Sequence, residues 1–223
     1  MSTPHCALCQ APVRAPFRAP TAELAPDLDM RPGEPARSTL PRWVPTCRTC
    51  GASAPDLAAL PAQAKAVVES AEYRALRGPA PELPFLRWAM ICENAGDPAA
   101  AAEATLQAAW ALDDAGRDAA ALRCRAVALW GTPADTADAL RLIDMLRRAG
   151  AFEAAGHAAS TLEAQSPDEN SANILRFQQA RIAAQDSGRH MLSSALRPPA
   201  RTPHVTHGRA PAHPGFWRRL LGR

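Results

Sequence analysis

Aromatic side chains and lysine are scarce in this chain of 223 residues. Aromatic residues make up 5% of it, and Lys65 is the only lysine among 25 basic side chains. Alanine supplies much of the 47% apolar content, and small apolar side chains suit packed helices better than pleated sheets, which favour β-branched and aromatic residues. The composition therefore predicts a mainly helical protein. Abundant alanine and the use of arginine in place of lysine indicate a GC-rich, bacterial gene.

Long apolar runs are also absent. No stretch approaches the roughly 20 uninterrupted apolar residues of a membrane-spanning helix, and Met1–His5 has neither the charged nor the apolar region of a signal peptide. We therefore expect a cytoplasmic protein with reduced cysteines, with peripheral contact at the inner membrane surface as an alternative.

Acidic residues are missing after Asp186, where seven arginines follow. The chain up to that point is mildly acidic, with 18 basic and 22 acidic side chains, which is not the charge of a nucleic-acid-binding domain. Residues 189–223 are predicted to be a disordered basic tail. Its end can contact an anionic membrane or a partner's groove, or can simply be a frayed terminus; the residues concerned are Phe216, Trp217, Arg218, Arg219, Leu220 and Leu221.

Catalytic motifs are absent as well. The chain has no glycine-rich phosphate loop, no Ser-His-Asp pattern and no HExxH. Asp113 and Asp114 are adjacent acids at an expected helix end and are predicted to be solvated, and His157 has no evident nucleophile or base as a partner. We therefore expect a protein that is not an enzyme and has no small-molecule substrate.

Two short cysteine pairs are the strongest chemical signal that is present. Cys6 and Cys9 form one CxxC turn, Cys47 and Cys50 form the second, and Gly51 can take the positive φ that such a turn uses. Four thiolates on two tight turns predict a closed, structural Zn²⁺ site. The alternatives are a redox dithiol, although neither pair is set in a βαβ unit, and a pair of disulfides. His5 is a weaker candidate ligand.

Proline and helical periodicity divide the chain into segments. Residues 1–54 are predicted to form a zinc-ribbon-like module, with short strands at 13–18 and 42–45. Residues 55–188 are predicted to form seven helices in antiparallel hairpins, beginning near residues 56, 82, 98, 117, 133, 151 and 167. The third, fifth and seventh are predicted to begin with an N-cap followed by proline, at Asp97-Pro98, Thr132-Pro133 and Ser166-Pro167. Gly-x-x-x-x-Ala frames begin at Gly96, Gly116 and Gly150; the last two are 34 residues apart, the tetratricopeptide period. Cys92 and Cys124 are predicted to be buried in these helices, and Trp88, Trp110 and Trp130 to lie in the core.

The order of these features resembles an uncharacterised bacterial family, a domain of unknown function in which two CxxC knuckles precede tetratricopeptide-like helices. The matching pieces are Cys6-x-x-Cys9, Asp27-x-Asp29, Trp43 through Ala52, Leu86-Arg87-Trp88-Ala89 and Ala108 through Asp114. The chain departs from that pattern at Ala7 and Arg48, where the family has proline, and at Gln10, where the first knuckle has glycine. The resemblance implies the fold and the metal, and no activity.

Three functions are compatible with this organisation. The first is a non-enzymatic adaptor that binds a protein or peptide through its helical repeats. The second is a regulatory nucleic-acid-binding protein, which requires six arginines to converge on one face: Arg14, Arg18, Arg31, Arg37, Arg42 and Arg48. The third is an adaptor tethered to a membrane surface by its C-terminal segment.

Overall fold

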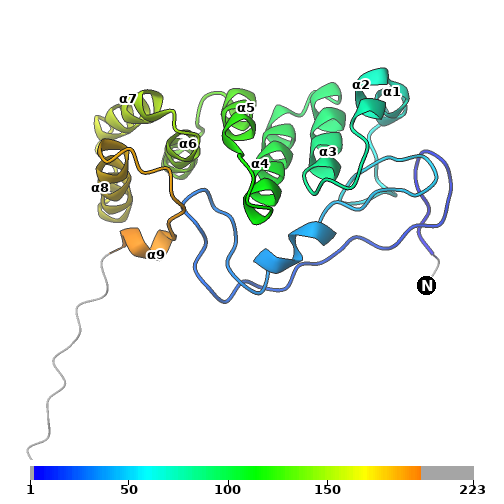
Figure 1. The fold of residues 1–223 in the computed structure, drawn as a ribbon, viewed down its shortest axis with the longest axis horizontal. Helices are drawn as coiled ribbons and strands as arrows, with labels where there is room; N and C mark the ends of the chain where they lie inside the picture. Colours follow the sequence, from blue (N-terminus) through cyan, green and yellow to red (C-terminus); the bar gives the residue numbers. More distant parts are fainter. Residues whose placement is uncertain (1–2, 197–223) are drawn as a thin grey trace, which may run out of the picture.

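The computed structural model describes residues 3–196, and within them the protein is mainly helical. A 3₁₀ helix, η1, precedes nine α-helices, and the described residues contain no β-strand, only three isolated bridges. The helices form a row, along one edge of which the N-terminal segment runs (Figure 1). Their bounds are η1 Arg37–Arg42, α1 Ala64–Glu69, α2 Ala71–Ala75, α3 Leu83–Asn94, α4 Pro98–Asp114, α5 Ala120–Trp130, α6 Thr136–Arg148, α7 Phe152–Glu163, α8 Glu169–Ala183 and α9 Leu192–Ala195.

The central helices begin and end near the predicted residues. The Asp97 side chain accepts a hydrogen bond from the amide of Ala100, and Pro98 occupies the first turn of α4, so the predicted N-cap is confirmed. Gly96 and Gly116 follow α3 and α4 with φ of +78° and +64°, a conformation that closes a helix end at low cost only for glycine.

Three other helix starts differ from the prediction. The first predicted helix begins at Ala64 instead of near residue 56, and it is divided in two because the Ser70 side chain caps α2 directly after α1 ends. Thr132-Pro133 and Ser166-Pro167 are not caps. Asp135 and Asp168 cap α6 and α8 instead, each carboxylate accepting a hydrogen bond from a backbone amide of the first turn. A carboxylate close to the first-turn amides competes successfully with the upstream Thr-Pro and Ser-Pro pairs.

The Gly-x-x-x-x-Ala frames are only partly equivalent in space. Ala101 and Ala155, the last residues of the first and third frames, are both fully buried. Ala121, at the same place in the second frame, is exposed, because α5 begins only at Ala120. The two frames separated by the tetratricopeptide period therefore do not occupy matching positions.

The strands predicted at 13–18 and 42–45 are not formed. Residues 13–18 have no regular structure, and Arg42 ends η1. Pro41 within η1 has no amide hydrogen for a sheet ladder, which favours a short helical turn over a strand. The segment between the cysteine pairs instead follows the helices closely. We call residues 23–45 of this segment the strap.

The strap and the helices share their hydrophobic clusters. Leu40 and Val44 pack with Phe85, Leu106 and Trp110 of α3 and α4. A second cluster contains cysteines of both pairs together with Val67, Val68 and Tyr73 of α1 and α2. The predicted boundary between residues 54 and 55 therefore lies inside continuous cores. Small side chains of α4 take part in this packing, since Ala108 and Ala109 are fully buried in the cluster that contains Leu40 and Val44.

Residues 189–196, which the sequence places at the start of the tail, pair with the strap. The amide of Leu28 donates to the carbonyl of His190 at 3.0 Å, and the amide of Leu192 donates to the carbonyl of Pro26 at 2.8 Å. The described chain thus closes on itself beside α8, where α9 lies (Figure 1). The remaining predicted tail, residues 197–223, lies outside the described residues.

Candidate metal centre and the strap it closes

The two cysteine turns have the same backbone geometry. In the first knuckle, residues 5–12, the amide of Gln10 donates to the carbonyl of Cys6 at 2.9 Å. In the second knuckle, residues 46–53, Gly51 makes the equivalent bond to Cys47, also at 2.9 Å. Both turning residues have positive φ, +59° at Gln10 and +78° at Gly51. Gln10 therefore takes the left-handed conformation of the knuckle, although the family that the sequence resembles has glycine at this position.

The two knuckles bring all four predicted ligands together. The four sulfur atoms lie within 4.8 Å of one another. Sγ of Cys6 lies 3.8 Å from Sγ of Cys50, and Sγ of Cys9 lies 3.7 Å from Sγ of Cys47. A disulfide requires a sulfur–sulfur distance of about 2.05 Å, so the four cysteines are free thiols. The cluster can hold a metal ion.

Backbone amides of the knuckles point at the sulfur atoms. Burial disfavours the Cys47 thiolate, but the amides of Cys50 and Thr49 outweigh it and lower the pKa of Cys47 to about 7. Burial dominates at Cys50 and raises its pKa to about 12, against the amide of Ala52. One thiolate is therefore favoured in the free protein, while a cation is needed to ionise its neighbour.

The surroundings of the cluster fix the knuckles to the helices. Cys6 and Cys47 are buried, whereas Cys9 and Cys50 are half-buried at the edge. The Tyr73 hydroxyl donates to the carbonyl of Gly51 at 3.2 Å and accepts from the amide of Ser53 at 3.0 Å. His5 is exposed and is not among the clustered ligands.

The strap carries a second polar centre, around Asp29. This carboxylate is fully buried. Its Oδ2 accepts a hydrogen bond from Nε1 of Trp110 at 3.0 Å and an ion-paired one from Arg148 at 2.7 Å. Arg123 lies 3.8 Å from the same oxygen and also pairs with Asp113 at 2.5 Å, as does Arg148 at 2.7 Å. Two carboxylates, one on the strap and one on α4, thus alternate with two arginines where the strap meets the helices.

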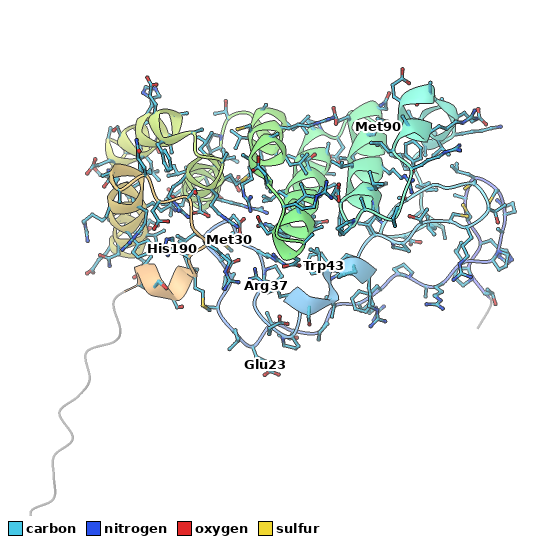
Figure 2. The ribbon with its side chains drawn as sticks, viewed as in Figure 1. Glu23, Met30, Arg37, Trp43, Met90 and His190 are labelled. Carbon is cyan, nitrogen blue, oxygen red and sulfur yellow. The ribbon has the colours of Figure 1, made fainter. Side chains whose placement is uncertain are left out.

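Neighbouring charges extend this cluster. Arg31 is 1% exposed, and it donates to Asp114 at 2.5 Å and to the carbonyl of Trp110 at 3.3 Å. Arg37 pairs with buried Asp27 at 2.9 Å. Figure 2 labels Met30 and Arg37 on the strap and His190 before α9, all along the same edge of the helices. We call Asp29, Arg31, Asp113, Asp114, Arg123 and Arg148 the charged cluster.

The charged cluster changes the interpretation of the adjacent acids. Asp113 and Asp114 were both expected to be solvated. Asp114 is exposed as expected but also pairs with Arg31, whereas Asp113 is partly buried and ion-paired with two arginines. Burial opposes ionisation of Asp113, but the Arg123 hydrogen bonds and the charge of Arg148 hold its pKa below the usual range. The sequence signal for this cluster is the charged Asp27-x-Asp29-x-Arg31 stretch within a proline-rich segment, for which no site was predicted.

The other singled-out residues lie apart from both centres. Cys92 is buried, which raises its pKa to about 12. Cys124 is exposed, so its predicted burial is wrong; α5 turns this position to solvent. Trp110 is in the core, while Trp88 and Trp130 are partly buried against it. His157 is exposed.

Comparison with known proteins gives no relative from which a role can be transferred: no family model, curated protein or solved structure matches the chain. Among residues 3–196, no helix has the length and apolar character needed to cross a membrane.

Proposed function

We propose that the protein is a non-enzymatic adaptor whose four N-terminal cysteines hold a structural Zn²⁺, and whose helices bind a protein or peptide partner. The observation that carries the proposal is the cluster of four sulfur atoms contributed by two matched knuckles. Cys6, Cys9, Cys47 and Cys50 would supply all four ligands. A tetrahedron of four sulfurs leaves no open position for a substrate, so the ion would maintain structure.

The sulfur distances support zinc. Zn–S bonds of about 2.3 Å in a regular tetrahedron place the sulfurs about 3.8 Å apart. The cross-knuckle distances, 3.8 Å between Cys6 and Cys50 and 3.7 Å between Cys9 and Cys47, agree with this edge. Soft thiolates in tetrahedral array also exclude the hard cations Mg²⁺ and Ca²⁺.

A hollow between helices supports the binding of a partner. It has a volume of about 530 Å³ and lies between α5, α6 and α7. Its walls include Val127, Leu142, Leu146 and Leu162, with Thr132 and Gln165 among the polar residues. Apolar walls with a few polar groups suit an apolar side chain presented by a peptide. The likeness of these irregular helical hairpins to tetratricopeptide repeats stays a prediction.

Metal analysis of the purified protein tests the first part. We expect about one equivalent of zinc in the wild type, and loss of both zinc and knuckle structure in Cys47→Ser. Cys124→Ser is the matched control because Cys124 is an exposed cysteine away from the cluster. Full zinc content in Cys47→Ser would contradict the site.

Affinity capture from the native host tests the second part. We expect Leu146→Glu to lose a partner that the wild type retains, since it places a charge within the apolar hollow. Capture that is the same for wild type and Leu146→Glu would assign binding to another surface, and a folded protein that retains no partner would contradict the adaptor.

The nucleic-acid alternative loses part of its expected surface. Arg31 is buried and Arg37 is ion-paired with Asp27, so the six arginines do not form one free face. Arg42 lies over the ring of Phe17, with its guanidinium carbon 4.0 Å from the ring centre. The membrane alternative depends on residues 215–223, which lie outside the described residues.

A further inference from the structure

The charges of the described chain are separated along its length. Residues 3–20 and 41–87, which we call the knuckle half, contain the knuckles, α1, α2 and the start of α3, and carry eight basic and four acidic side chains. Residues 21–40, between these two ranges, carry two basic and four acidic side chains. Residues 88–196, which we call the helical half, carry nine basic and fourteen acidic side chains. Four thiolates around a divalent ion have a formal charge of −2, so the knuckle half stays positive when the site is loaded.

The arginines of the two halves also differ in their partners. In the helical half, every arginine except Arg176 forms an ion pair with a carboxylate. In the knuckle half, the basic side chains form no ion pair within the described residues; they are Arg14, Arg18, Arg42, Lys65, Arg74, Arg77, Arg87 and Arg48. Among the described residues, cations without a carboxylate partner therefore belong mainly to the knuckle half.

Two of these arginines face a groove between the knuckles. The groove has a volume of about 440 Å³, with Arg14 from beyond the first knuckle and Arg48 from the second among its lining residues. No acidic side chain of residues 3–196 lines it. A second hollow beside the cysteines, of about 300 Å³, has Lys65, Arg74 and Arg77 but also Glu69. Of these two hollows, only the groove between the knuckles has no acidic side chain of the described residues in its lining.

We propose that this groove binds an acidic, extended peptide segment of a partner protein. Arginine forks donate paired hydrogen bonds to carboxylates. The rest of the lining includes Pro12, Val13, Pro45 and Leu57, which suits apolar side chains between the acidic ones. Nucleic acid is less well matched, because single strands require stacking platforms and no aromatic ring of the described chain lines the groove.

This inference rests on the adaptor function proposed above and names the chemistry of the partner. The test uses a short fluorescein-labelled peptide of alternating glutamate and leucine, measured by fluorescence anisotropy at low ionic strength with metal-loaded, full-length protein. We expect Arg14→Glu combined with Arg48→Glu to weaken binding at least about tenfold, since each reversal replaces attraction by repulsion.

Arg176→Glu on α8 is the matched control. Arg176 is exposed and bonds only to Oδ1 of Asn173 among the described residues, so the change reverses an arginine far along the chain from the groove. We expect less than about a twofold effect from it, because a distant surface charge is screened. The same peptide with glutamine in place of glutamate should bind no more tightly to the wild type than to the double variant. Zinc content and circular dichroism verify that each variant is folded.

Three results would overturn the proposal. They are no binding of the glutamate peptide, equal loss in the double variant and in Arg176→Glu, and tighter binding of a labelled single-stranded oligonucleotide that the double variant abolishes. The adaptor proposal fails separately. If a captured partner persists with the Arg14 and Arg48 reversals, the groove assignment is wrong while the adaptor function stands.

Discussion

Replacement of Asp29 by asparagine removes one charge from the centre of the strap without changing the size of the side chain. The new amide oxygen can still accept the hydrogen bond from Nε1 of Trp110. The neutral amide cannot compensate the charge of Arg148, whose 2.7 Å ion pair with Asp29 is 7% exposed on the arginine side and fully buried on the aspartate side. With its oxygen in that place, the new NH2 group replaces Oδ1 and cannot accept the 3.3 Å hydrogen bond from the amide of Arg31. The substitution therefore removes the ionic contact and this one long hydrogen bond.

The structure places the expected loss at the lower end of the range for buried pairs. Removing one partner of a buried ion pair costs about 3–5 kcal/mol. Here Asp113 remains 2.7 Å from Arg148 and 2.5 Å from Arg123, so neither arginine is left without a carboxylate. We expect Asp29→Asn to lower the free energy of unfolding by about 3 kcal/mol, which corresponds to about 6–12 °C in Tm for a chain of this size.

Urea denaturation followed by tryptophan fluorescence, with the metal site loaded, measures this loss. Asp118→Asn is the control, because Asp118 is exposed and its carboxylate only accepts from the nearby Ala120 amide; it should change stability by at most about 0.5 kcal/mol. In a double-mutant cycle with Arg148→Gln, we expect a coupling energy above about 0.5 kcal/mol. A loss below about 1 kcal/mol in Asp29→Asn would refute the assignment of the strap's anchorage to this ion pair.

Removal of the metal by a chelator should increase hydrogen exchange in residues 23–45 while α6–α8 stay protected, because the ion closes the loop that holds the strap; equal loss in α6–α8 would show one cooperative unit. Burial, and then the charge of Asp29, raise the pKa of Asp144 to about 6 from 3.8. Between these two pKa values, Asp144 is protonated in the folded protein and ionised in the unfolded chain. Its contribution to stability therefore falls by up to about 3 kcal/mol as pH rises from 4 to 6. Asp144→Asn should remove that decline relative to wild type in urea titrations at each pH, and an unchanged slope would contradict the raised pKa. Gly33→Ala should cost about 1–3 kcal/mol in the same assay, since a Cβ there would lie 2.3 Å from the carbonyl oxygen of Leu24; an unchanged midpoint would show that the strap yields at this turn.

The metal ligands could be predicted from sequence because a CxxC knuckle is a local structure. Cys6 and Cys9, and likewise Cys47 and Cys50, are fixed by turns of about six residues or fewer, and the chemistry of four thiolates then favours their convergence. The start of α4 is similarly local, as the Asp97 cap shows. Where the whole determinant lies within one turn, the pattern of residues is sufficient.

The strap could not be predicted because its determinants are distant in sequence. Asp29 meets Trp110 and Arg148, which are 81 and 119 residues away. Nothing in an irregular, proline-rich segment shows which helix arginine will approach it. The strands expected at 13–18 and 42–45 are absent because the backbone hydrogen bonds there are local: the amide of Val13 donates to the carbonyl of Pro4 and the amide of Trp43 donates to the carbonyl of Leu40.

Arginine replaces the hydrogen-bond ladder that the strap lacks. Buried backbone carbonyls need donors, and a segment without strands has few backbone partners. Arg141 donates through Nε to the carbonyl of Asp29 at 3.0 Å and through its second nitrogen to Glu103 at 2.7 Å. Arg31 serves the Trp110 carbonyl and the Asp114 carboxylate in the same way.

A lysine ammonium is a compact point charge, whereas the planar guanidinium directs donors to a carbonyl and a carboxylate at once. Arg147 repeats the arrangement between Asp144 and the carbonyl of Asp186. At these three positions arginine is therefore the residue that the structure uses, whatever the composition of the gene. Irregular backbone is held against helices by forked donors, and Lys65, the only lysine of the chain, lies on the exposed face of α1.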